Sequence, residues 1–125
     1  MLTAAAESNL GEYLRQYPTG PALGVFQMEP KTHADIWANY LHRRLVLAEA
    51  VACGIDPWKR EEALEYHLAY AILMARVHYL RVRESLPDAS SPYALAVYWK
   101  RYYNTTRGKG DINHAITAYR AFCGE

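Results

Sequence analysis

The apolar residues of this chain recur at helical spacing, and almost none alternate with the period of two that a half-buried strand requires. Proline stands where three of the expected helices should begin, at Pro30, Pro57 and Pro92. Proline suits the first turn of a helix because its missing N–H would have no partner there and its φ is already helical. The pattern therefore predicts an all-α fold class.

The expected helices differ in length and in surroundings. One should run from Pro30 to a stop at Gly54, and the longest should cover about 59–82. The middle of the longest, 69–75, is nearly continuous apolar sequence, so this helix is expected to be central and largely buried. Two more are expected over 93–104 and 112–123.

Irregular backbone is expected at two places, over 9–29 and over 104–110. Ordering a long loop costs conformational entropy, so such a loop more often lines a functional site than fills space. The two loops are expected to meet across one cleft.

Composition and charge restrict the class of protein. At 125 residues, with 51% hydrophobic and 22% charged residues, the chain should fold as one domain, 1–125, around a core of its own. The formal net charge is +1 and no segment gathers Lys and Arg on an uncompensated face, so nucleic-acid binding is not expected. No apolar run approaches the roughly 18 residues of a membrane span, and MLTAAAES lacks the pattern of a secretory signal.

Metal and cofactor sites are not expected either. His33 and Asp35 are two residues apart, whereas ligands on a helix usually lie three or four apart. His67 and His78 can share a helix face, but no third ligand accompanies them. The chain has no Gly-rich phosphate loop, and its two cysteines form no ligand-spaced pair, so they are expected to be reduced and structural.

Glu7 is the candidate for a catalytic acid. It follows a run of alanines, in a segment too apolar for a plain surface turn, so its carboxyl is expected to be partly buried. Burial raises the pKa of a carboxyl and makes it a usable proton donor near neutral pH. Taken alone, these features favour a solvated residue near a terminus for Glu7, and Ser8 fits a turn hydroxyl.

Three motifs along the chain change that balance. They are Glu7-Ser8, then ALGVFQMEP at 22–30, then YYNTTRGKG at 102–110. Their order and separation resemble those of the goose-type and soluble lytic transglycosylase branch of the lysozyme superfamily, in a small phage or prophage version. That family shows Glu-Ser, then Gly-Leu-Met-Gln-Ile-Met-Pro, then Ala-Tyr-Asn-Ala-Gly. The resemblance implies a lysozyme-like domain with a central long helix and irregular cleft loops.

The resemblance also implies an activity, namely cleavage of the β-1,4 bond between N-acetylmuramic acid and N-acetylglucosamine in peptidoglycan. Glu7 would protonate the leaving oxygen and then take a proton from the C6 hydroxyl of the muramyl sugar, which closes an anhydro ring. Peptidoglycan glycan strands would be the partner, and no cofactor would be needed.

The supporting roles carry over motif by motif as substrate-binding residues. Ser8, Gln27 and Asn104 would offer hydrogen bonds to the sugar's acetamido and hydroxyl groups. Met28 would contact a sugar face, and Tyr103 would lie beside Glu7 and the reacting sugar. The residues themselves leave other roles open, since Gln27 and Asn104 can tie loop backbone and Tyr103 can belong to the core.

The sequence also departs from the family pattern. Glu29 stands where the family usually has Met, and NTTRGKG replaces Asn-Ala-Gly. A second carboxylate roughly 6.5 to 9.5 Å from the acid would position water and make the enzyme a hydrolase, whereas a Glu before proline is more often an exposed loop residue.

Two functional classes follow. One is a phage-encoded lysis or cell-entry enzyme, made in the host cytoplasm without a signal peptide and acting at the bacterial cell wall or carried in the virion. The alternative is a non-catalytic, lysozyme-like structural or binding component of a phage particle, with other virion proteins as partners.

Overall fold

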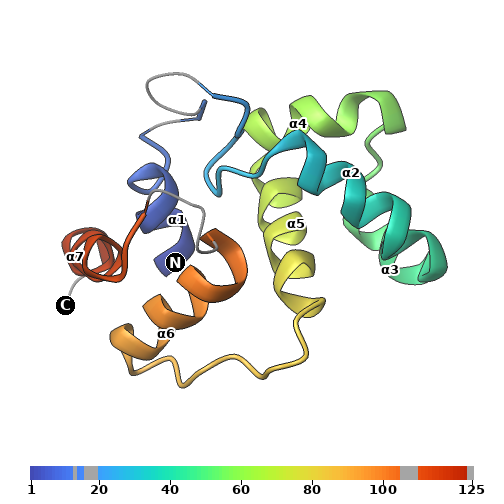
Figure 1. Ribbon diagram of the computed structural model, residues 1–125. Coiled ribbons are helices and arrows are strands. Elements are labelled where there is room, and N and C mark those ends of the chain that lie inside the picture. Colours follow the sequence, from blue (N-terminus) through green and yellow to red (C-terminus); the bar gives the residue numbers. More distant parts are fainter. Residues whose placement is uncertain (13, 16–19, 105–109, 124–125) are drawn as a thin grey trace.

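The computed structural model describes residues 1–12, 14–15, 20–104 and 110–123 of the chain. All regular structure in these ranges is helical, which confirms the predicted all-α class (Figure 1). The only strand-like pairing among the described residues consists of two isolated bridges, Arg15 with Leu23 and Leu23 with Met28.

The helices are α1 (Leu2–Ser8), α2 (Pro30–Asn39), α3 (Leu45–Ala52), α4 (Arg60–Tyr66), α5 (Leu68–Leu80), α6 (Pro92–Trp99) and α7 (Ile112–Cys123). Short 3₁₀ turns, η1 (Leu41–Arg43) and η2 (Pro57–Lys59), precede α3 and α4. A π-helical turn, η3 (Lys100–Asn104), continues α6. The predictions of helix over 93–104 and 112–123 are therefore confirmed to within a residue.

The prediction of one long helix over about 59–82 is wrong. His67 has an extended backbone, with φ −108° and ψ 95°, and divides the segment into α4 and α5. Its Nδ1 accepts a hydrogen bond from the Tyr70 N–H at 3.1 Å, which satisfies one of the free donors at the start of α5. The helix expected from Pro30 to Gly54 is likewise divided, because the chain turns at η1 to bury Leu41 completely.

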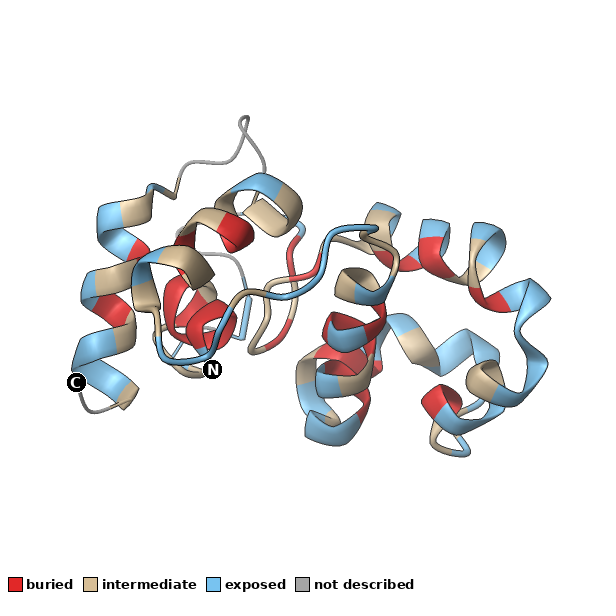
Figure 2. Cartoon of the chain, turned by 90° about the horizontal axis from the view of Figure 1, so that it is seen from below, coloured by how far each residue is buried: buried red, intermediate tan, exposed pale blue. Residues whose placement is uncertain are grey.

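The buried side chains form two clusters, and Figure 2 shows where they gather along the helices. The larger cluster lies among α2, α3, α4 and α5, and consists of Met28, Ile36, Leu41, Val51, Ala63, Leu64, Tyr70, Met74 and Val77. The smaller cluster lies among α1, α6 and α7, and consists of Leu2, Ala6, Ala96, Trp99 and Ala115.

Helix α5 is buried on one face only, which corrects the expectation of a largely buried helix. Tyr70 and Met74 are fully buried on that face, whereas Leu68 and Ile72 are 58% and 47% exposed on the other. The middle of the segment is apolar on both faces, so periodicity could not show which face would be covered.

Tyrosines at the end of α5 connect the two clusters. The Tyr79 ring stacks on that of Tyr103 from η3, with centroids 5.3 Å apart, and lies 5.7 Å from that of Tyr98 in α6. The Tyr79 hydroxyl shares a hydrogen bond of 2.6 Å with the Thr3 hydroxyl of α1. The end of α5 is thus fixed against α1, α6 and η3.

Candidate active site

Glu7 lies in the last turn of α1, against the start of η3. Its Oε1 accepts a hydrogen bond of 3.0 Å from the indole N–H of Trp99, a residue that is itself 1% exposed. Burial raises the pKa of Glu7 from its ordinary 4.5 to about 7. The Trp99 and Asn104 hydrogen bonds and the nearby charges of His114 and Lys100 lower the pKa, but they do not offset the burial.

Asn104 is oriented by Lys100, four residues earlier in η3. The Lys100 ammonium donates to the Asn104 side-chain oxygen at 2.8 Å, which leaves the amide NH₂ group to donate to Glu7. The same ammonium also donates to the Gly110 carbonyl at 2.5 Å. Lys100 therefore fixes the amide that faces the candidate acid.

Trp99 is held in place by the backbone at Gly110. A Cβ added at Gly110 would lie 2.7 Å from the Trp99 ring and 3.4 Å from the Asn104 amide nitrogen. Only a residue without a side chain fits there, so Gly110 sets how deeply Trp99 sits beside Glu7.

The segment 23–28 forms a tight loop facing this region. Leu23 and Met28 exchange backbone hydrogen bonds of 3.0 Å in both directions. Gly24 has a φ of +82°, and Gln27 has a φ of 48°. Both the backbone N–H and the side-chain amide of Gln27 donate to the Gly24 carbonyl, each at 3.0 Å, so the turn closes on itself.

Two hydroxyl groups tie this loop to the other motifs. The Ser8 hydroxyl, fully buried, donates to the Val25 carbonyl at 2.5 Å and accepts from the Gly11 N–H at 2.9 Å. The Tyr103 hydroxyl donates to the Phe26 carbonyl at 2.7 Å. The three motifs, far apart in sequence, are thus joined by direct contacts.

Four of the predicted site residues are brought together, namely Glu7, Ser8, Tyr103 and Asn104. The other two, Gln27 and Met28, have contacts elsewhere in the fold. The Gln27 side chain bonds its own loop, and Met28 is 3% exposed inside the larger cluster. Contacts from Ser8, Gln27 and Met28 to a sugar therefore remain predictions, and their observed contacts are structural.

Some sequence expectations cannot be placed. Residues 13, 16–19 and 105–109 of the two predicted loops lie outside the described residues. Glu29, the possible second carboxylate, pairs with Lys31 at 3.5 Å, and its side chain is 39% exposed. Those contacts match a loop residue.

Sequence reasoning missed three of the residues that surround Glu7, namely Trp99, His114 and Lys100. Trp99 looked like an ordinary apolar helix position, although the indole N–H of a buried tryptophan needs an acceptor. Lys100 and Asn104 stand at i and i+4, a spacing that places two side chains on one helix face and could have suggested the pair.

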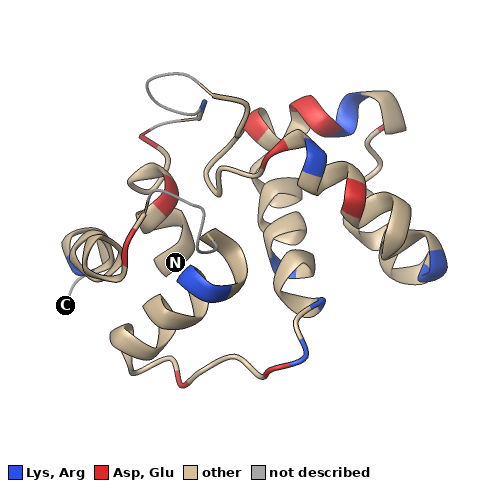
Figure 3. Cartoon of the chain, viewed as in Figure 1, with Lys and Arg blue, Asp and Glu red and all other residues tan. Residues whose placement is uncertain are grey.

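Figure 3 shows the charged residues spread over the helices. Among the described residues, no group of three or more His, Cys, Asp or Glu side chains is arranged to hold a metal ion. Within the same ranges, no helix has both the length and the apolar character needed to cross a bilayer. No protein-family model, curated protein or solved structure matches this chain.

Proposed function

We propose that this protein is a lysozyme-like lytic transglycosylase that cleaves the β-1,4 bond between N-acetylmuramic acid and N-acetylglucosamine of bacterial peptidoglycan. The observation that carries the proposal is a half-buried Glu7, whose pKa is raised to about 7 and whose carboxyl accepts hydrogen bonds from Trp99 and from Asn104 of the third motif. A carboxyl with such a pKa is about half protonated at neutral pH, which suits a group that acts first as a general acid and then as a base.

The contacts of Glu7 suit proton donation. The Trp99 N–H can donate but cannot accept, so it orients Oε1 without taking the acidic proton. The carboxyl would protonate the glycosidic oxygen while positive charge develops on the muramyl ring. The resulting carboxylate, oriented by Trp99 and Asn104, would then accept the proton of the C6 hydroxyl as that oxygen attacks the anomeric carbon.

A single carboxylate is enough for this sequence of steps. The nucleophile belongs to the substrate, so proximity replaces an activated water and a second carboxylate to hold it. The contact of Glu29 with Lys31 supports this version over a two-carboxylate hydrolase. The proposed setting is a phage enzyme for lysis or cell entry that acts at the bacterial cell wall.

A second candidate is a non-catalytic lysozyme-like component of a phage particle. It is favoured by the internal contacts of Ser8, Gln27 and Met28, which hold the protein together rather than face outward. The raised pKa of Glu7 favours the enzyme, since a structural module has no need of a desolvated carboxyl.

The test is cleavage of purified peptidoglycan by the wild-type chain and by Glu7→Gln, with mass spectrometry of the products. Gln keeps the shape and can accept from Trp99, but it cannot donate a proton to the leaving oxygen. We expect a loss of about 10⁴-fold, at the upper end for general acid catalysis, because one group acts twice. The products should carry anhydro-muramyl ends.

Glu29→Gln is the matched control, since it removes a carboxylate from a neighbouring segment and should leave activity within about twofold. Full activity in Glu7→Gln would refute the mechanism. Reducing muramyl ends together with an inactive Glu29→Gln would mean a hydrolase. An inactive wild-type chain on peptidoglycans of several compositions would favour the structural component.

A further inference from the structure

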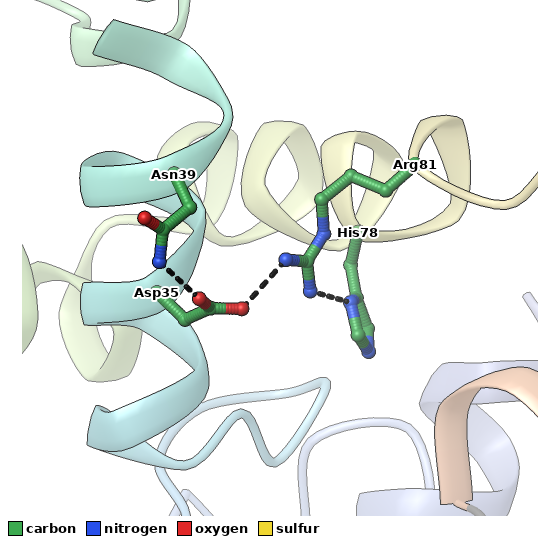
Figure 4. A network of polar contacts seen from close by, with 4 residues as sticks. All are labelled: Asp35, Asn39, His78 and Arg81. Carbon is green, nitrogen blue, oxygen red and sulfur yellow. Dashed lines mark hydrogen bonds and ion pairs between the residues drawn. The ribbon is translucent and has the colours of Figure 1, made fainter.

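A polar network lies behind the candidate site, between α2 and the end of α5 (Figure 4). Asp35 of α2 accepts from Asn39 at 2.6 Å and from the Arg81 guanidinium at 2.8 Å. A second guanidinium nitrogen of Arg81 lies 3.0 Å from Nδ1 of His78. Arg81 therefore bridges a carboxylate on one helix and an imidazole on another.

The chemistry of the guanidinium fixes the state of His78. Arginine can only donate hydrogen bonds, so Nδ1 of His78 must be the acceptor and carry no proton. Burial and then the charge of Arg81 lower the pKa of His78 from 6.5 to about 4, against the opposing charge of Asp35. His78 is thus neutral throughout the range in which Glu7 titrates.

His78 in turn contacts the site through Tyr103. The two rings meet edge to face, with centroids 4.8 Å apart and planes at 67°. The opposite neighbour of Tyr103 is Tyr79, stacked on it, and the hydroxyl of Tyr103 donates to the Phe26 carbonyl. Burial raises the pKa of both tyrosines, and the negative charge of Glu7 raises both further. Tyr103 thus contacts His78 of the polar network and lies close enough to the candidate acid to be affected by its charge.

We propose that Arg81 and His78 are positioning residues of this site: Arg81, anchored on Asp35, holds His78 as a neutral acceptor, and the His78 ring keeps Tyr103 packed beside Glu7. The groups that face His78 are Tyr79 from α5, Arg81 directly after that helix, Asp35 from α2 and Tyr103 from η3. Only the catalytic consequence of this positioning rests on the proposed function.

The physical consequence is exclusion of water from Glu7. If Tyr103 is free to move, water reaches the carboxyl and its charged form is better solvated. Loss of Arg81 should therefore lower the pKa of Glu7 through the rings of His78 and Tyr103, although Arg81 does not contact the acid directly.

The experiment measures the pKa values of His78 and Glu7 by NMR titration in the wild type, in Arg81→Gln and in Arg83→Gln. Arg83 carries the same charge two residues further on and is exposed, so it controls for the loss of one positive charge. In Arg81→Gln we expect the pKa of His78 to rise from about 4 toward 6.5 and that of Glu7 to fall by about one unit. Arg83→Gln should change neither.

A second variant, His78→Asn, keeps an acceptor for Arg81 but removes the ring that touches Tyr103. It should lower the pKa of Glu7 in the same direction, and it replaces the first test if Arg81→Gln does not fold. The proposal would be overturned if the pKa of Glu7 is unchanged in the folded variants, or if it shifts equally in Arg83→Gln.

Activity separates this proposal from the proposed function. In an active enzyme, Arg81→Gln should lower kcat about fivefold at neutral pH, with little change in KM, because a fall of one unit in the pKa of Glu7 lowers its protonated fraction at pH 7 from about one half to about one tenth. The pH limit of activity should move down with the pKa of Glu7. If the wild type does not cleave peptidoglycan but the NMR shifts occur as described, the positioning stands and only the proposed activity fails.

Discussion

Gly24 shows how strongly one residue can constrain the candidate site. Its φ of +82° is unfavourable for any residue with a side chain, and a Cβ there would lie 1.9 Å from the Leu64 carbonyl oxygen at the end of α4. The loop that Ser8 and Tyr103 hold is therefore pressed directly onto the backbone of the larger cluster.

Gly24→Ala should destabilise the fold by about 3 kcal/mol or more, through the strained φ and the overlap with backbone that cannot rotate away. Gly54→Ala is the matched control, because Gly54 has a φ of +70° but nothing within 4 Å of an added Cβ. The free energy of unfolding of Gly54→Ala should fall by only about 1 kcal/mol. Urea unfolding of both variants checks this, and equal losses would show that the Leu64 contact does not matter.

At the scale of the residue, the sequence predicted the partial burial of Glu7 but not which groups would surround its carboxyl. The alanines before it indicated burial, and the motif order indicated which segments would approach it. The indole N–H that binds it comes from 92 positions away and lies in an apolar helix that gives no polar signal. The roles of Ser8 and Gln27 were also open, because a hydroxyl or amide bonds loop backbone as readily as a ligand.

Among the elements, α5 is the one whose position matters most to the site. One face packs into the larger cluster, and its last turn presents His78 and Tyr79 to η3. The His67 break that precedes it could not be read from the sequence, since neither glycine nor proline occurs between 58 and 86 and a histidine is a rare cap. The periodicity of the apolar residues correctly predicted helix on both sides of His67.

Ala71→Asp tests which face of α5 is covered. Ala71 is 4% exposed, so an aspartate there would be buried without a partner and should cost about 3 to 5 kcal/mol, enough to unfold many domains of this size. Ile72→Asp, one position on and 47% exposed, should cost much less. Thermal melts followed by circular dichroism compare the two. Similar melting temperatures would mean that the buried face has been misassigned.

For the whole molecule, three ionisable groups whose pKa is shifted by desolvation set the dependence of stability on pH between 4 and 7. Glu7 has a raised pKa of about 7, so between pH 4.5 and 7 the native state keeps a proton that the unfolded chain has lost. His33, buried and bonded to the Tyr70 hydroxyl, and His78 both have pKa values lowered to about 4. Between pH 4 and 6.5 each lacks a proton that the unfolded chain binds.

From pH 4.5 to 6.5 the unfolded chain therefore holds one more proton than the native protein, two on histidines against one on Glu7. The free energy of unfolding should rise by about 1.4 kcal/mol per pH unit in that window, and then fall between pH 6.5 and 7 as Glu7 alone contributes. Glu7→Gln should double the slope of the free energy of unfolding between pH 4.5 and 6.5, and it should remove the decrease between pH 6.5 and 7. Urea unfolding across pH 4.5 to 8 measures the free energy of unfolding of both proteins. A wild-type slope equal to that of the variant would mean that Glu7 titrates normally.

The packing of α1 against α6 and α7 bears on how the protein is made. A ribosome produces Glu7 well before Trp99, Asn104 and His114, the residues that surround its carboxyl. Helices α2 to α5 can form the larger cluster before α1 is packed, since their contacts are mostly local in sequence. On the nascent chain Glu7 is an ordinary solvated carboxylate. Its affinity for a proton at neutral pH is acquired only when α6 and α7 pack against α1.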